Sequence, residues 1–384
     1  MADLIDYVTW RADVTFDYSP FNKIDALIFS QISYLNLKGF VPESFDEEIV
    51  FEDFASFVDV RAQKKLKKTL GPLINPETFD LLMAASKSER FGKLKLCGFR
   101  DIFSKKNCEQ FCAFTVKGKG WNCICFRGTD ETIIGWKEDF YLGCMDQIPA
   151  QKDALDYFTD ALDSLKGKFY VAGHSKGGNE AMYVAINATS KQKKKITKVF
   201  NFDGPGFVKE TMESENYKNI SDKILSVYPE CSIVGMIFHH PSNFDIVESS
   251  EFIVMQHDAF SWNIMGNDFV KKDKFKDESI FFHATFNQFC AAMSRQEMKN
   301  ITDKLFDLFL NTGCRTLDDI DDDKLQVSAK VLYELYQLDS RDRKEIKKMA
   351  GMFLKAGKGN FPLFNSFKPS ISRNSGIIKS LKKD

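Results

Sequence analysis

The chain has 384 residues, of which 43% are hydrophobic and 28% charged, so it has enough apolar material for a sizeable core and is not a disordered chain. Its 53 Lys and Arg nearly balance its 54 Asp and Glu, and the net charge of −1 favours neither nucleic acid nor an anionic bilayer as a partner. No apolar run approaches the ~20 residues that span a membrane. The acidic start lacks the apolar stretch of a secretory signal, so we expect a soluble cytoplasmic protein.

The nine cysteines are an odd number without a C-x-x-C pair, which argues against a disulfide framework and a zinc ribbon. Cys123 and Cys125 alternate with apolar neighbours, as small buried strand residues do. We therefore expect neither a metal nor another cofactor.

The first ninety residues show apolar positions at helical spacing, as in Ile24–Tyr34. This pattern predicts a mainly helical N-terminal region over residues 1–90, packed on the rest of the chain. The pattern then changes to strands at Leu94–Arg100, Phe111–Val116 and Asn122–Phe126, with a hairpin turn over 117–120 before the last of them.

Beyond residue 130, strands alternate with helices, which predicts a parallel sheet covered by helices on both faces. We expect helices at Gln151–Leu165 and Asn179–Ala188. The expected strands are Lys168–Ala172, Ile196–Phe202, Lys223–Tyr228 and Glu251–Met255. Residues 91–290 are thus predicted to form an α/β core.

After about residue 285 the pattern is helical again, at Gln296–Leu310 and Leu325–Leu338. The acidic run 318–323 lacks the glycine and glutamate of a calcium loop and is interpreted as a solvated helix start. We expect residues 291–384 to form a helical C-terminal region that ends in a loose basic tail.

The sequence Gly173-His-Ser-Lys-Gly177 follows a predicted strand and precedes a predicted helix, which is the context of a nucleophile elbow. In such a tight turn Gly173 and Gly177 avoid a steric collision, and the Ser175 hydroxyl leaves the carboxyl edge of the sheet as a nucleophile. The N–H of Lys176 then opens a helix, where the dipole favours an oxyanion. The alternative is a strand-to-helix turn without catalysis.

A second oxyanion donor should come from the loop after an earlier strand, and the N–H of Thr129 is our candidate. Phe126-Arg-Gly-Thr129, followed by Trp136-Lys-Glu-Asp-Phe140, resembles the F-R-G-[ST] and W-x-x-D-[LF] motifs of class 3 lipases. The segments 17–22 and 201–206 are also similar to a broad group of uncharacterised bacterial proteins related to those lipases. These resemblances imply an α/β-hydrolase-like fold, with a mostly parallel central sheet and residues 91–290 as its core.

The base must follow the serine in the order Ser, acid, His, which restricts it to four histidines. His257 is preferred because it lies just beyond the predicted strand Glu251–Met255, where this fold carries its base. His239 and His240 are interpreted as caps of a predicted helix at Ser232–Phe238. The fourth candidate is His283.

The acid is less clearly marked. Class 3 lipases carry an aspartate after the strand that corresponds to Lys223–Tyr228, but Ser232 aligns there and Glu230 lies two residues earlier. Asp203 ends the strand Ile196–Phe202, a placement similar to that in pancreatic-type lipases. We favour Asp203, with Glu230 as the alternative acid, because an aspartate at a strand's carboxyl end faces the site. Asp203 could also simply form the turn before Gly204.

The resulting hypothesis is a serine hydrolase that cleaves small-molecule or lipid carboxylic esters through an acyl-enzyme on Ser175. Two alternatives stay open: a catalytically inactive binding module of the same fold, and a thioesterase or peptidase that uses the same site. Ile133 and Ile134 could contact an acyl chain or form part of a short lid, although packing of a helix face is the simpler interpretation. The sequence does not indicate an oligomeric state.

Overall fold

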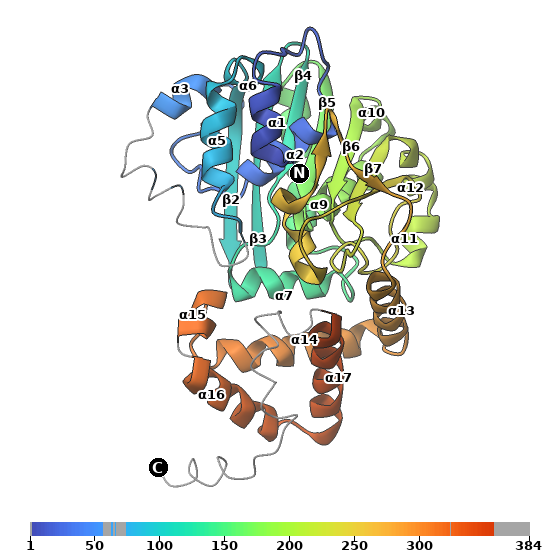
Figure 1. Ribbon diagram of the computed structural model, residues 1–384. Helices are drawn as coiled ribbons and strands as arrows, with labels where there is room; N and C mark the ends of the chain where they lie inside the picture. Colours follow the sequence, from blue (N-terminus) through green and yellow to red (C-terminus); the bar gives the residue numbers. More distant parts are fainter. Residues whose placement is uncertain (1, 57–62, 64–65, 67–73, 323, 357–384) are drawn as a thin grey trace.

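The computed structural model describes residues 2–56, 63, 66, 74–322 and 324–356, and within them one large sheet organises the chain (Figure 1). Its nine strands follow the order β1-β2-β3-β4-β5-β6-β7-β8-β11. The strands are β1 Ile49–Val50, β2 Lys95–Ser104, β3 Glu109–Gly118, β4 Trp121–Phe126, β5 Lys168–His174, β6 Ile196–Phe202, β7 Ile224–Pro229, β8 Phe244–Val247 and β11 Lys271–Lys272. A separate hairpin pairs β9 Ile264–Met265 with β10 Asp268–Phe269.

The central strands β4 to β8 are parallel, and antiparallel strands extend the sheet on both sides. Helices connect β4 to β5, β5 to β6 and β6 to β7, as is usual for parallel neighbours, whereas turns connect β7 to β8. The architecture is therefore mixed α/β, with a parallel central region flanked by helices, in the manner of an α/β hydrolase. This confirms the fold class predicted from the sequence.

Helices cover both faces of the sheet. One face packs against α1 Leu4–Trp10, α2 Lys23–Ile32 and α5 Thr78–Lys87, and the other against α8 Pro149–Ser164 and α9 Lys176–Asn187. Shorter helices complete these layers: α3 Phe51–Ser56, α6 Glu89–Gly92, α10 Ser190–Lys193, α11 Lys209–Glu213 and α12 Glu215–Lys218.

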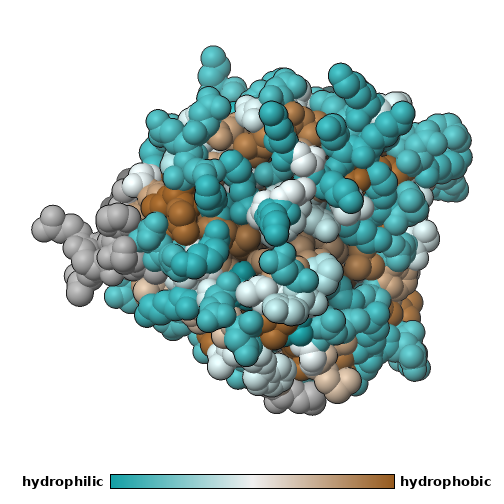
Figure 2. Space-filling model, turned by 90° about the horizontal axis from the view of Figure 1, so that it is seen from above, coloured by the Kyte–Doolittle hydropathy of each residue, from teal (hydrophilic) through white to brown (hydrophobic). Residues whose placement is uncertain are grey.

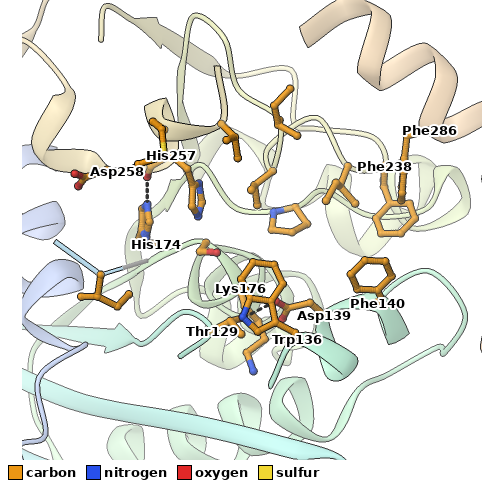
Figure 3. A pocket seen from close by; sticks show the side chains of 18 of the residues that line it. Thr129, Trp136, Asp139, Phe140, His174, Lys176, Phe238, His257, Asp258 and Phe286 are labelled. Atoms are coloured by element: carbon orange, nitrogen blue, oxygen red, sulfur yellow. Dashed lines mark hydrogen bonds between the residues drawn. The ribbon is translucent and has the colours of Figure 1, made fainter. Parts of the chain in front are cut away.

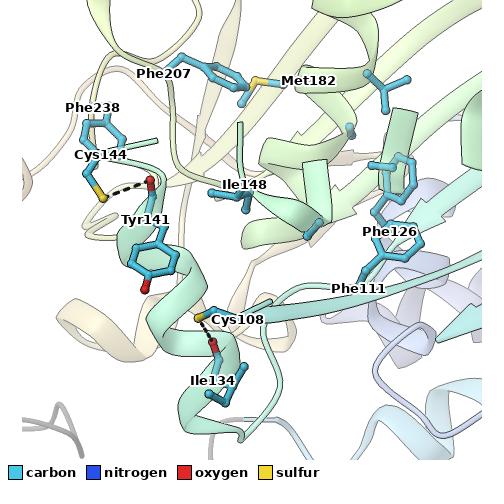
Figure 4. Packing of buried hydrophobic residues seen from close by; sticks show 14 of the residues in the cluster. Cys108, Phe111, Phe126, Ile134, Tyr141, Cys144, Ile148, Met182, Phe207 and Phe238 are labelled. Atoms are coloured by element: carbon cyan, nitrogen blue, oxygen red, sulfur yellow. Dashed lines mark hydrogen bonds between the residues drawn. The ribbon is translucent and has the colours of Figure 1, made fainter. Parts of the chain in front are cut away.

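Side chains alternate between two apolar clusters because successive residues of a strand point to opposite faces. On β4, Ile124 and Phe126 join the cluster with α8 and α9, whereas Cys123 and Cys125 join the one with α2. Figure 4 shows Phe111 and Phe126 of the first cluster on their strands, with Ile148 and Met182 elsewhere in the same cluster. The prediction that both cysteines are small buried strand residues is confirmed.

Helix α7 (Ile133–Tyr141) follows β4 and lies across the lower end of the sheet in Figure 1, where the parallel strands have their carboxyl ends. Beneath α7 lie the C-terminal helices, defined here as α13 to α17. Their bounds are α13 Asp277–Ala291, α14 Arg295–Leu310, α15 Leu317–Asp322, α16 Lys324–Gln337 and α17 Ser340–Ala356. Figure 2 looks onto the opposite end of the molecule, where hydrophilic side chains cover most of the surface and leave smaller apolar patches between them.

Two predicted elements are wrong. Residues 251–255 are not a strand: the chain there enters the 3-10 helix η3 (Ile253–His257), and the edge of the parallel region is formed instead by β8 at Phe244–Val247. Ser232–Phe238 is not a helix but a series of turns. In the first of these segments Val254 and Met255 line a pocket and Phe252 is exposed, so this apolar run does not fill a sheet.

The other predicted strands and helices lie within a few residues of the observed ones, and the acidic run opens α15 as expected. Ile133 and Ile134 are buried in the apolar cluster behind α7, which agrees with helix packing. The predicted basic tail falls in residues 357–384, outside the described chain, and the boundaries at residues 90 and 290 stay predictions. Among the described helices, none combines the length and apolar character of a membrane crossing.

Candidate active site

Ser175 lies at a sharp turn between β5 and α9. Its backbone has φ 59° and ψ −132°, a strained conformation for a residue with a side chain, and its N–H donates to the Phe202 carbonyl at 2.9 Å. A Cβ atom on Gly173 would lie 2.2 Å from the carbonyl carbon of Gly177, and one on Gly177 would lie 2.2 Å from the Phe126 oxygen. The predicted need for glycine at both positions is confirmed as a packing requirement.

His257 and Asp203 meet beside this turn. Nδ1 of His257, at the end of η3, lies 2.7 Å from Oδ2 of Asp203, which directly follows β6 with a positive φ of 48°. The Asp203 side chain is fully buried, whereas that of His257 is partly exposed. Because Nδ1–H donates to the carboxylate, Nε2 of His257 is the ring nitrogen left to accept a proton. Ser175 and His257 line the same pocket.

Glu230, the alternative acid, is placed elsewhere. Its carboxylate forms an ion pair with Lys276 at 3.1 Å, and its N–H donates to the Val247 carbonyl at 2.9 Å. Of the two acids considered from the sequence, Asp203 is therefore the one that contacts His257.

The other candidate histidines do not line the pocket that Ser175 and His257 share. His239 exchanges backbone hydrogen bonds with Phe207, and the ring of His240 packs against Tyr228 at 5.8 Å. Neither caps a helix, because the predicted helix before them is absent, so that interpretation is wrong. Nδ1 of His283 donates to the Met236 carbonyl at 2.8 Å.

Thr129 and Lys176, whose N–H groups are the two predicted oxyanion donors, line the same pocket as Ser175, and Figure 3 shows their side chains beside Asp139. The Thr129 hydroxyl donates to Oδ2 of Asp139 at 2.5 Å. Burial raises the pKa of Asp139 to about 7, even though Lys176 opposes this shift. Asp139 is the aspartate of the W-x-x-D-[LF] motif at residues 136–140. Its contact fixes the Thr129 side chain against α7.

The side chain of Lys176 turns into the interior while its backbone begins α9. Nζ donates to Oε2 of Glu138 at 2.8 Å, and to the carbonyl and Oε1 of Gln110 at 2.6 and 2.9 Å. Burial alone would lower the pKa of this ammonium group, but the surrounding carboxyl groups, led by Glu138, together outweigh burial and raise it. This buried ion pair ties the first turn of α9 to α7.

Glu180, one turn further along α9, is also fully buried, and neither carboxyl oxygen has a hydrogen-bond partner among the described residues. Burial raises its pKa well above the ordinary value, which favours the neutral acid. It was not identified from the sequence, because an apolar helix face gives no sign of a buried glutamate.

His174 and Ser232 were likewise not identified as site residues. Nε2–H of His174 donates to the His257 carbonyl at 2.9 Å, and its Nδ1 accepts from the Tyr34 hydroxyl at 2.9 Å. Burial, aided by His257, lowers the pKa of His174 well below the usual range and keeps the ring neutral. Its position immediately before the elbow serine was the available signal.

Ser232 donates its hydroxyl to Oδ1 of Asp203 at 2.5 Å, and the N–H of Gly235 donates to the same oxygen at 3.2 Å. The sequence did contain an indication of this role, since Ser232 aligns with the expected aspartate of class 3 lipases. Its side chain thus lies close to the acid rather than replacing it.

The pocket has a volume of about 300 Å³ and is polar near Ser175 and apolar further away. Its polar part brings together a hydroxyl on a strained turn, an imidazole paired with a carboxylate, and the amino end of a helix, an arrangement suited to acyl transfer. Among the described residues, no cluster of His, Cys, Asp and Glu is arranged to hold a metal ion.

Comparison with known proteins gives one family and a few distant structures. The crystal structure of M37 lipase is 14% identical, with a TM-score of 0.36, and the match covers 56% of this chain and 68% of that one. A mutant of MDLA from Penicillium cyclopium is 11% identical, with a TM-score of 0.39, and the match covers 65% and 85% of the two chains. No curated protein matches the sequence. The model of the family described as Mbeg1-like matches residues 85–307, more than half of the chain. The chain therefore belongs to the Mbeg1-like family.

Proposed function

We propose that the protein is a serine hydrolase of the lipase and esterase type, which cleaves carboxylic esters through an acyl-enzyme on Ser175. The observation that carries this proposal is the 2.7 Å contact between His257 Nδ1 and Asp203 Oδ2 beside a serine held on a strained strand-to-helix turn. Ser175 and His257 line one pocket, and the buried Asp203 contacts His257, so that three separate segments contribute in the chain order that this class of enzyme uses.

In the proposed reaction, Nε2 of His257 accepts the Ser175 proton as Oγ attacks the acyl carbonyl carbon. Asp203 holds the ring orientation and stabilises the imidazolium. The protonated His257 then gives this proton to the departing alcohol, and the acyl group stays bonded to Ser175. Water, deprotonated by His257, then attacks the acyl carbon. As the bond from that carbon to Oγ breaks, His257 returns the proton to Ser175 and the carboxylic acid is released.

The N–H groups of Thr129 and Lys176 are the proposed donors to the oxyanion of each tetrahedral intermediate. Lys176 begins α9, so the positive end of the helix dipole adds to its N–H. The loss of one such donor typically raises the barrier by about 3–4 kcal/mol. The Asp139 contact to Thr129 and the Glu138 contact to Lys176 hold both donors in place before substrate binds.

The resemblance to class 3 lipases, carried by the segments 126–129 and 136–140, supports an ester or lipid ester as substrate. The cytoplasmic location and the bacterial relationship expected from the sequence are part of this proposal. A thioester or peptide substrate and an inactive binding module of the same fold are alternative outcomes of the test below.

The test uses the purified full chain with p-nitrophenyl esters, acyl thioesters and peptides, and compares wild type with Ser175→Ala. We expect ester hydrolysis in wild type and its loss in a folded Ser175→Ala protein. Ser190→Ala, an exposed serine at the start of α10, serves as the matched control and keeps wild-type rates. Turnover of thioesters or peptides alone would reassign the substrate, and ester hydrolysis that survives in folded Ser175→Ala would overturn the proposal.

A further inference from the structure

The pocket at Ser175 has two chemically different ends. His174 and His257 lie at one end, and Phe140, Phe238 and Phe286 gather at the other, as Figure 3 shows. We call this second end the apolar end and assign to it the three phenylalanines, their neighbours Gly143 and Ile237, and the other lining residues of the C-terminal helices, Phe289, Met298 and Met349. None of these described lining residues is charged, so a polar group placed there would lose its hydration without compensation.

The far wall of the apolar end comes from the C-terminal helices. Phe286 and Phe289 lie on α13, Met298 on α14 and Met349 on α17, and each of these side chains is buried. Met349 lies outside residues 85–307, the range that the family model matches. This part of the wall is therefore a feature of the present chain beyond the shared family region.

Phe238 is held in the wall at a conformational cost. Its φ of 63° is unusual for an aromatic residue, and its ring packs edge-on against Phe286 at 5.5 Å. A Cβ atom on Gly143 would lie 2.9 Å from this ring, so the absence of a side chain on Gly143 leaves room for it. His283 and Asn287 of α13 bond to the carbonyls of Met236 and Phe238, which fixes the segment to the helix.

The C-terminal helices are anchored to α7, the helix that carries Asp139. Lys137 forms ion pairs with Asp303 at 3.1 Å and Asp307 at 3.2 Å, and the Tyr141 hydroxyl donates to Asp303. The Phe140 ring meets the Phe306 ring at 5.2 Å in an edge-on contact. The wall is therefore attached to the same helix that supports the proposed oxyanion site.

The direction of the pocket indicates which half of an ester would occupy the apolar end. His257 must protonate the departing alcohol, so the alcohol has to leave on the His257 side of Ser175. The acyl chain then extends away from His257, and the apolar end lies on that side of the pocket in Figure 3. The phenylalanine and methionine side chains of the apolar end offer an acyl chain an apolar and adaptable surface.

We propose that the apolar end is an acyl-chain subsite, that the substrates are esters of unbranched fatty acids, and that Met298 and Met349 set the preferred chain length. This inference rests on the proposed function, because it places the acyl carbonyl at Ser175. The subsite is closed by the C-terminal helices, so these helices determine specificity without supplying a catalytic group.

Binding tests the subsite independently of catalysis. Folded Ser175→Ala protein is titrated with hexanoate, octanoate, decanoate and dodecanoate by calorimetry. Burial of about 0.8 kcal/mol per methylene corresponds to roughly fourfold tighter binding for each added CH₂ until the subsite is full. An affinity that does not rise with chain length would overturn the subsite even if the protein hydrolyses esters. The same titration remains informative if no ester is hydrolysed, so the two proposals can fail separately.

Two substitutions of opposite sense then test the wall. Met349→Trp should shorten the preferred chain and lower the ratio of kcat/KM for p-nitrophenyl decanoate over butyrate at least tenfold, and Met298→Ala should raise that ratio. Met265→Trp, at an exposed methionine in the separate hairpin, is the matched control and should leave the ratio unchanged. The proposal is contradicted if both pocket variants fold and show the control's chain-length dependence. Faster cleavage of long-alcohol acetates than of long-acyl esters would reverse the assigned orientation and reject it too.

Discussion

Ser232 donates its hydroxyl to Oδ1 of Asp203 at 2.5 Å, while Oδ2 of the same carboxylate lies 2.7 Å from Nδ1 of His257. The two contacts use both oxygens of one buried acid, and the Gly235 N–H adds a third donor. Ser232 thus restrains the carboxylate that orients the proposed base.

Ser232→Ala should lower kcat/KM for esters by about tenfold. A hydrogen bond to a charged group is worth about 1.5–3 kcal/mol, and the Gly235 N–H would retain part of that restraint. The measurement is the pH profile of kcat/KM for wild type, Ser232→Ala, Ser232→Thr and the exposed control Ser190→Ala. Ser232→Thr keeps a hydroxyl and should recover most of the rate. If Ser232→Ala matched Ser190→Ala across the profile, the restraint on Asp203 would be irrelevant to catalysis.

His174 should make stability sensitive to acid. Burial lowers its pKa in the folded protein, so the unfolded chain binds the proton more readily, and stability present above about pH 6.5 is lost as the pH falls below it. The slope is at most about 1.4 kcal/mol per pH unit for one proton. Urea unfolding between pH 5 and 7 is the measurement, and His174→Gln should show a shallower decline than wild type. Identical slopes in the two proteins would show that His174 is not held neutral by the fold.

Asp139 should have the opposite effect on stability. Its pKa is raised by burial to about 7, so the folded state holds a proton that the unfolded chain has lost above about pH 4. Stability is therefore full below the unfolded pKa and is lost as the pH rises through 7. Asp139→Asn removes this pH-dependent contribution to stability. The difference in unfolding free energy between the variant and wild type should therefore change steadily from pH 4 to 7. A difference that does not change with pH over this range would show that Asp139 ionises normally.

Lys176→Met should be strongly destabilising. It leaves Glu138 buried without its cation, and the loss of one partner of a buried ion pair costs about 3–5 kcal/mol. Chemical unfolding measures the loss. Lys152→Met, at an exposed lysine that forms an ion pair with Asp156, is the control and should leave stability nearly unchanged. Equal effects of the two substitutions would mean that the Lys176 contacts add nothing to the fold.

The local rules of sequence were sufficient for the elements that position Ser175. Strand β5, the two glycines of the turn and helix α9 all follow from an apolar run, a steric requirement and a helical period within twenty residues. The end of β6 was enough to select Asp203, and order along the chain restricted the base to four histidines. His257 was preferred for its place after an expected strand that the structure replaces with η3, and it nevertheless contacts Asp203. Their catalytic roles remain predictions.

The features that depend on distant parts of the chain could not be predicted. The charged Asp245 interrupts the apolar pattern of β8, but it is paired in the fold with Lys23 at 2.6 Å and Lys271 at 2.9 Å. The apolar run at 252–255 was mistaken for a strand because it faces a pocket whose far wall, including Met349, comes from the end of the described chain. Periodicity reports that a residue is apolar, but not which remote surface it contacts.

The central claim, that Ser175 is a nucleophile activated by His257, is tested most directly by intact-mass and peptide mapping after reaction with a fluorophosphonate probe. The account predicts one covalent adduct per chain, on Ser175, that forms rapidly in wild type and is suppressed by at least a hundredfold in folded His257→Ala protein. A wild-type protein that is folded yet unlabelled at Ser175, or labelling of Ser175 at an equal rate without His257, would contradict it.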